Sequence, residues 1–139
     1  MADIRHVTEG FAVAPQLSSV DFAELKALGF RQVINNRPDG EAPGQMTSAE
    51  AEAAAKEAGL TYVHAPFVGR PTEEAVAAAA NSAAPTLAFC RSGTRSINAW
   101  ALAQAQKGGM SPEEIVLAAQ NAGYDLSPMK DLLRRLSPA

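Results

Sequence analysis

The sequence predicts one α/β domain over residues 1–139, in which a mostly parallel central sheet is flanked by helices. Short apolar runs of strand type alternate with longer runs of helical periodicity, as in βαβ units. The length of 139 residues and the hydrophobic content of 47% are those of a domain that buries its own core. No internal repeat or domain-splitting linker interrupts this pattern.

The first quarter of the chain predicts two strands, a helix and a third strand. They cover residues 4–7, 11–14, 20–28 and 32–35. Glu9-Gly10 is the turn that joins the first two strands. Phe22, Leu25 and Leu28 have helical spacing, and Gly29 follows them as a helix end.

The middle of the chain continues the alternation of helix and strand. Its expected elements cover residues 47–59, 61–65, 72–82 and 86–89. Thr47 and Glu50 have the spacing of a capping box, and Gly59 ends the helix that they begin. Pro66 closes the next strand, and Pro85 separates the alanine-rich helix from the strand that follows it.

The last third of the chain predicts helices only. They cover residues 97–104 and 111–123, and a final helix begins at Ser127-Pro128. Ser111 and Glu114 form another capping box, with Pro112 at the first helical position. Leucines in the final helix, including Leu133, provide its apolar face.

Cys90, the only cysteine, lies between the last predicted strand and the helix after it. The free amides and the positive dipole end of that helix favour an anion, and the thiolate is the nucleophilic form of cysteine. An isolated cysteine is more often a small buried apolar residue. Arg91 and Arg95 favour the reactive interpretation, because burying them without an anion would be costly.

The residues around Cys90 suggest how a transferred group would be held. Cys90 would attack phosphorus or sulfur, and the planar fork of Arg95 would bind the oxyanion in two contacts. Ser96 is either a hydroxyl partner of the thiolate or the helix cap. The full set of expected anion-binding residues is Arg91, Ser92, Gly93, Thr94, Ser96 and Arg37.

A second polar loop follows the strand at 32–35. Asp39 in this loop could be a general acid, or simply the turn residue of Pro38-Asp39-Gly40. Arg37 could widen the positive pocket or pair with Glu41. Because ligands gather at the carboxyl ends of parallel strands, we expect the loops 36–46 and 66–71 to converge with the Cys90 loop.

Three segments resemble the phosphatase-like domain of beta-lactamase hydrolase-like proteins. They are residues 33–41, the loop that begins at Pro66, and the Cys90 loop, and the likeness covers nearly the whole chain. The resemblance implies a tyrosine-phosphatase-like α/β fold with a phosphate-binding cysteine loop. It also implies that Cys90 is the nucleophile and that Arg95 binds the anion.

The chain departs from related cysteine phosphatases in two ways. They place one residue more between cysteine and arginine, whereas this chain places four, as in single-domain rhodaneses that carry sulfur as a persulfide. They usually keep an aspartate general acid upstream, but no aspartate lies between Tyr62 and Cys90. Three functions therefore remain open: a thiolate hydrolase, a sulfurtransferase, and a non-catalytic module that binds an anion or a partner.

Composition restricts the other partners. A net charge of −3 gives no electrostatic case for nucleic acid or an anionic membrane, so we expect a small anionic or phosphorylated substrate. Two histidines and one cysteine predict no metal site, and we expect no cofactor. The apolar run Ala75–Ala80 is too short to span a bilayer, and no apolar signal core is visible, so we expect a cytoplasmic protein. The alanine-rich helix could pack on its own sheet or on a second copy.

Overall fold

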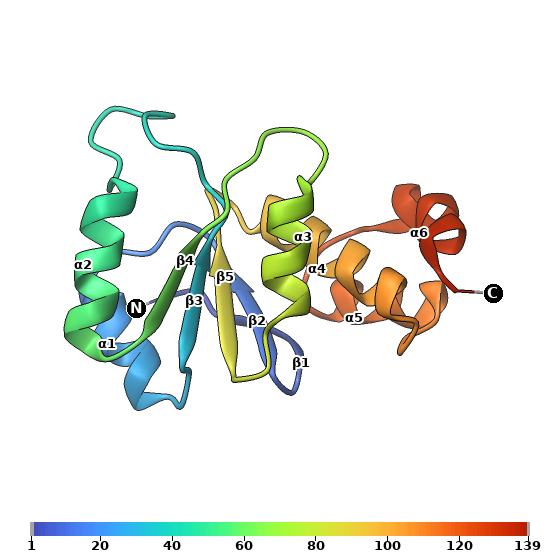
Figure 1. Ribbon diagram of the computed structural model, residues 1–139, viewed down its shortest axis with the longest axis horizontal. Coiled ribbons are helices and arrows are strands. Elements are labelled where there is room, and N and C mark those ends of the chain that lie inside the picture. Colours follow the sequence, from blue (N-terminus) through green and yellow to red (C-terminus); the bar gives the residue numbers. More distant parts are fainter. Residues whose placement is uncertain (1, 139) are drawn as a thin grey trace.

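A five-stranded sheet runs through the molecule between two layers of helices (Figure 1). The computed structural model describes residues 2–138. Its strands are β1 (Arg5–Thr8), β2 (Phe11–Ala14), β3 (Gln32–Asn35), β4 (Thr61–His64) and β5 (Thr86–Phe89). Its helices are α1 (Ser19–Ala27), α2 (Ser48–Ala58), α3 (Glu73–Ala80), α4 (Thr94–Lys107), α5 (Pro112–Asn121), the 3₁₀ turn η1 (Ser127–Met129) and α6 (Lys130–Leu136).

The strand order is β1-β2-β5-β3-β4, and only the β1–β2 pair is antiparallel. A tight turn joins that pair, whereas each parallel neighbour is reached through a helical crossover. Phe89 at the end of β5 is in register with both Ala14 and Asn35. The chain therefore leaves β2, β5 and β3 at the same edge of the sheet, which confirms the predicted mostly parallel α/β architecture.

Each face of the sheet has its own core. On one face α1 and α2 cover a cluster that includes Phe22, Leu87 and Phe89. On the other face α3 and α4 cover a cluster that includes Ile34 and the fully buried Trp100, and α5 and α6 pack outside α4 (Figure 1). Burial on both faces explains why β2 is a continuous apolar run and why β5 is apolar from Leu87 to Phe89, rather than alternating.

The predicted elements are all present, with differences at two helices. The helix after the Cys90 loop begins at Thr94 rather than at residue 97, because its first turn is polar and carries no apolar periodicity. The last helix begins as a 3₁₀ turn over 127–129, and α6 starts only at Lys130. The capping boxes begun by Thr47 and Ser111 are confirmed.

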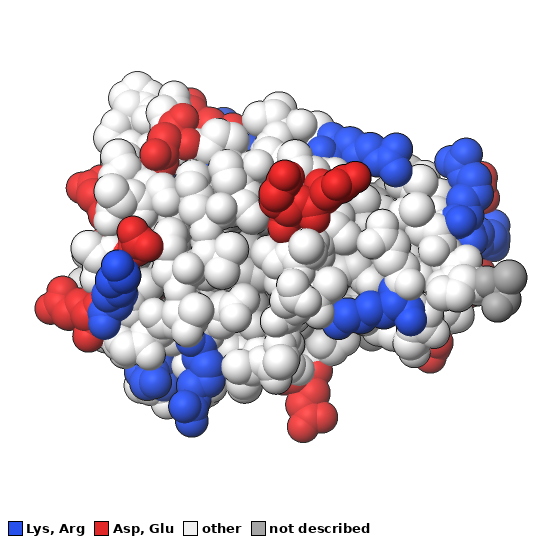
Figure 2. Space-filling view, in the orientation of Figure 1, with Lys and Arg blue, Asp and Glu red and all other residues white. Residues whose placement is uncertain are grey.

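Charged side chains of both signs are scattered over the face shown in Figure 2, among a majority of uncharged residues. This face therefore presents no broad basic surface of the kind that nucleic-acid-binding domains use. Within residues 2–138, no helix combines the length and the apolar character that crossing a bilayer requires.

Candidate active site at the Cys90 loop

Three loops meet at the carboxyl edge of the sheet, at the top of Figure 1. They are the loop after β3, the loop after β4 and the Cys90 loop after β5. Arg95 connects them: its Nη1 and Nη2 each lie 2.8 Å from a carboxylate oxygen of Glu41, and Nη1 lies 3.3 Å from the carbonyl oxygen of Phe67. The expected convergence of these loops is confirmed.

Cys90 lies at the base of this site and is only 1% exposed. Its Sγ accepts a hydrogen bond of 3.1 Å from the backbone N–H of Gly93. The sulfur therefore faces an amide of its own loop, next to the start of α4.

The guanidinium of Arg95 contacts Glu41 and lies close to Cys90. The hydrogen bond with Glu41 is the main cause of a raised pKa for Arg95, and the charge of nearby Cys90 adds to it. Arg95 is thus a positive charge close to Cys90, although Glu41 occupies its two-point fork in this arrangement.

Glu41 is held by two arginines. Besides Arg95, its carboxylate accepts a 3.0 Å hydrogen bond from Nε of Arg37. The hydrogen bond from Arg95, aided by the one from Arg37, lowers the pKa of Glu41 to about 2, against the opposing effect of burial. Glu41 is therefore ionised at neutral pH and has no proton to donate to a leaving group.

Arg37 lies beneath Glu41 and is only 5% exposed. Its Nη1 donates a 3.0 Å hydrogen bond to Oε1 of Gln16, and its backbone N–H donates to Oδ1 of Asn35 at 2.9 Å. Its carbonyl oxygen lies 3.0 Å from Nε2 of His64. The expected Arg37–Glu41 pair is therefore present, and it brings a second positive charge to the site.

The carboxylate of Asp39 is not placed as the predicted general acid. It accepts a 2.8 Å hydrogen bond from the backbone N–H of Ser48, the first residue of α2. An ionised carboxylate is stabilised at a helix N-terminus, so the structural interpretation of Asp39 replaces the catalytic one. Glu41, two residues later, is the side chain that reaches Arg95.

Ser96 also differs from its predicted role. Its buried hydroxyl donates to Oδ1 of Asn36 at 2.8 Å, and the N-cap of α4 is Gly93. The hydroxyl proton is therefore used to hold the β3 loop against α4, and it is directed neither at Cys90 nor at an incoming oxyanion. The predicted capping role of Ser96 is therefore corrected, whereas anion binding through its backbone amide stays a prediction.

The remaining loop residues are placed on the solvent side. The side chains of Arg91, Ser92 and Thr94 are exposed, and the two hydroxyls lie 3.0 Å apart. Thr94 and Arg95 are the first residues of α4, where backbone N–H groups have no partner within the helix. These amides and Arg95 are the groups available to an anion at the helix N-terminus.

Tyr124, from the segment after α5, supports the Cys90 loop from outside. Its hydroxyl donates a 2.9 Å hydrogen bond to the carbonyl oxygen of Ser92, and its ring packs beneath the guanidinium carbon of Arg5 at 5.4 Å. Burial is the main cause of its raised pKa. Sequence reasoning missed this contact, because no motif connects Tyr124 to a loop about thirty residues earlier.

Gly93 allows this close approach, since a Cβ at this position would collide with the hydroxyl of Tyr124. Its φ of +91° is also strained for other residues. We expect Gly93→Ala to lower the free energy of unfolding by about 2–4 kcal/mol, from backbone strain plus overpacking. Gly29→Ala, at φ +100° with open space around it, should cost only about 1–2 kcal/mol. Urea denaturation of both variants measures the difference, and equal losses would contradict the contact with Tyr124.

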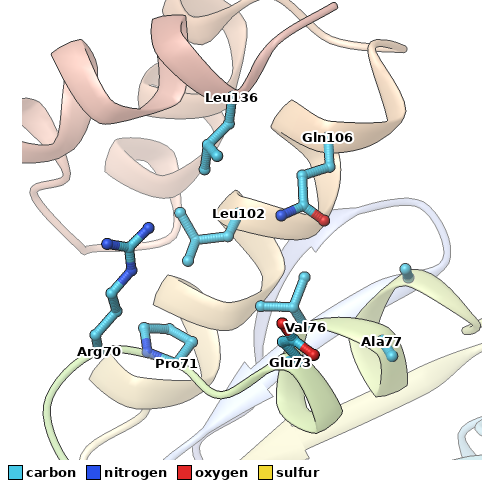
Figure 3. Close-up of a pocket in the computed structure, with 9 residues that line it drawn as sticks. Arg70, Pro71, Glu73, Val76, Ala77, Leu102, Gln106 and Leu136 are labelled. Carbon is cyan, nitrogen blue, oxygen red and sulfur yellow. The ribbon is translucent and has the colours of Figure 1, made fainter.

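The cavity shown in Figure 3 lies away from these groups, between α3, α4 and α6, and has a volume of about 510 Å³. Leu102, Val76 and Leu136 supply its apolar wall, and Arg70 and Glu73 lie at its margin. Cys90 is not among the residues that line it, so this cavity is separate from the Cys90 loop. Within residues 2–138, no three His, Cys, Asp or Glu side chains gather as a metal site would require.

Comparison with known proteins places the chain in a phosphatase-like group. A beta-lactamase hydrolase-like protein of Agrobacterium fabrum is 34% identical over 138 residues, which is 96% of this chain and 32% of that protein. The crystal structure of a phosphatase-like protein from Neisseria meningitidis is 31% identical, with a TM-score of 0.80 and coverage of 96% and 97% of the two chains. The structure of PTPMT1 with PI(5)P, at 19% identity, has a TM-score of 0.70 over 96% and 93%, which shows the shared tyrosine-phosphatase-like fold.

The chain spans about a third of the length of the curated relatives that it matches. The family model of the phosphatase-like domain matches residues 3–107, from before β1 to the end of α4. The match therefore includes the Cys90 loop and the loop that carries Glu41. This chain belongs to the phosphatase-like domain family of beta-lactamase hydrolase-like proteins.

Proposed function

We propose that this domain transfers sulfur through a persulfide on Cys90, with Arg95 and the first amides of α4 holding the oxyanion of the donor. The observation that carries this choice is the ionised Glu41: the carboxylate nearest the anion site has a pKa of about 2. Asp39, the other candidate acid, is bound at the N-terminus of α2. The site thus offers a nucleophile and positive charge, but no acidic proton.

Sulfur transfer from a thiosulfate-type donor fits these groups. The Cys90 thiolate would attack the outer sulfur of the donor, a new S–S bond would form, and the S–S bond of the donor would break. Sulfite would leave with the electron pair as a stable dianion, so this step needs no proton. A thiolate acceptor would then attack the outer sulfur of the persulfide and return Cys90 to its thiolate form.

Hydrolysis of a phosphate ester is the second candidate, supported by the family and by the fold it shares with tyrosine phosphatases. Its first step would release an alkoxide, which needs a proton from a general acid. Without that acid the rate would fall by about 10²-fold or more. The four residues between Cys90 and Arg95 also favour the sulfurtransferase interpretation.

The mass of the intact protein distinguishes the two reactions. We expect incubation with thiosulfate to add one sulfur atom at Cys90, and a thiol acceptor to remove it. An alkyl phosphate should add nothing and release little alcohol, because its alkoxide leaving group lacks a general acid. The Cys90→Ser variant is the control for sulfur bound elsewhere.

The opposite result would identify the hydrolase, namely a phosphate adduct or rapid release of the alcohol without any persulfide. If neither substrate modified Cys90, the result would favour a module that binds an anion or a partner without turnover.

A further inference from the structure

We infer that Glu41 is an internal occupant of the oxyanion site, and that a small tetrahedral dianion binds by displacing its carboxylate from Arg95 and Arg37. The inference deepens the proposed function, because it concerns the anion site beside Cys90 and rests on that assignment. It also names the class of substrate that the two arginines select.

The contacts of Glu41 are those that a substrate oxyanion would make. Both carboxylate oxygens accept from the fork of Arg95 at 2.8 Å, and one also accepts from Arg37 at 3.0 Å. Two-point recognition of this kind suits a carboxylate and a tetrahedral oxyanion equally well. An anion cannot use the fork of Arg95 while Glu41 remains on it.

Burial of the site is consistent with an occupied state. Cys90 is 1% exposed and Arg37 is 5% exposed, whereas Glu41 is 25% exposed. Glu41 is thus more exposed than Arg37 and somewhat more exposed than Arg95, whose side chain is 18% exposed. Moving its carboxylate would uncover positive charge beside the thiol.

The loop that carries Glu41 is held by other contacts, so its carboxylate can leave without unfolding the loop. Oε1 of Gln45 accepts a 2.9 Å hydrogen bond from the backbone N–H of Glu41, and Nε2 of Gln45 donates to the carbonyl oxygen of Pro38 at 2.8 Å. These contacts involve only the backbone of Glu41 and Pro38. A change of side-chain rotamer at Glu41 is therefore enough to open the site.

Charge decides which anions gain by this exchange. Arg37 and Arg95 carry two positive charges, and the carboxylate of Glu41 neutralises one of them. A dianion neutralises both, whereas a monoanion only replaces one negative charge with another. Because Arg37 is only 5% exposed, the second charge should count more beside it than it would in water.

The need to displace Glu41 also lowers the apparent affinity of the site for anions. An anion binds only to the fraction of molecules in which the carboxylate of Glu41 has moved away from Arg95. We expect Glu41→Gln to tighten sulfate binding about tenfold or more, because a neutral amide competes poorly for two arginines. Calorimetric titration of the Cys90→Ser protein with and without Glu41→Gln measures this change without any turnover. Glu57→Gln removes the same charge from an exposed position on α2 and should change affinity less than about twofold.

Two further measurements complete the test. Glu41→Asp keeps the charge but has a shorter side chain, so it should increase the affinity for sulfate by less than Glu41→Gln does. If Glu41→Gln does not fold, this variant tests whether sulfate displaces the carboxylate. Perchlorate, a tetrahedral monoanion, should bind the Cys90→Ser protein at least about tenfold more weakly than sulfate.

Unchanged or weaker sulfate binding in both Glu41 variants would overturn the inference and make Glu41 a support for Arg95. Equal binding of sulfate and perchlorate would refute the selection for dianions. These binding measurements do not depend on which group Cys90 carries. The displacement of Glu41 can therefore be refuted while a persulfide is found on Cys90. Equally, the displacement can be confirmed while no persulfide forms.

Discussion

Replacing Cys90 with serine should abolish sulfur transfer, lowering kcat/KM by about 10³-fold or more. The serine hydroxyl is far less nucleophilic than a thiolate, and it cannot form a persulfide. The side chain is similar in size and can still accept from the N–H of Gly93, so the loop should keep its shape. Steady-state kinetics with thiosulfate and a thiol acceptor measure the loss.

The binding of sulfate to the Cys90→Ser variant provides its control. An intact anion site with no turnover would show that the sulfur, rather than the loop geometry, is required. Activity within about tenfold of wild type would contradict the covalent mechanism. Transfer would then have to proceed directly between donor and acceptor.

The second large effect is expected at Arg95. Arg95→Lys should reduce kcat/KM at least about tenfold, equivalent to about 1.4 kcal/mol of lost transition-state stabilisation. A lysine offers a single charged nitrogen, whereas the fork of Arg95 reaches two oxygens of one carboxylate at 2.8 Å. The same two-point contact would hold the oxyanion of the donor as the S–S bond breaks.

Arg91→Lys is the matched control, since Arg91 lies on the same loop with its side chain exposed. Kinetics of the two variants under the same conditions should show a change of less than about twofold at Arg91. An unimpaired Arg95→Lys protein together with an impaired Arg91→Lys protein would transfer the anion-binding role to Arg91. Thermal denaturation shows whether either loss arises from reduced stability.

Local patterns in the sequence determined the order of the elements and the position of Cys90 between a strand and a helix. The capping box of Thr47 and Glu50, and glycine ends such as Gly59, are decided within a few residues of chain, and the structure has them where the sequence predicts. The convergence of the three loops also followed from sequence, because strands that alternate with helices become parallel and end at one edge of the sheet. Cys90 was recognisable because its loop joins the last of these strands to a helix.

Tertiary structure alone decided which distant side chains contact the Cys90 loop and Arg95. Asp39 and Glu41 lie in one loop and carry the same charge, yet Asp39 turns to the N-terminus of α2 and Glu41 to Arg95. Side-chain direction in a loop depends on partners that are distant in sequence: Glu41 and Arg95 are 54 residues apart, and Tyr124 is 32 residues from Ser92. No local propensity encodes such pairs, so they form only when the packed sheet brings its loops together.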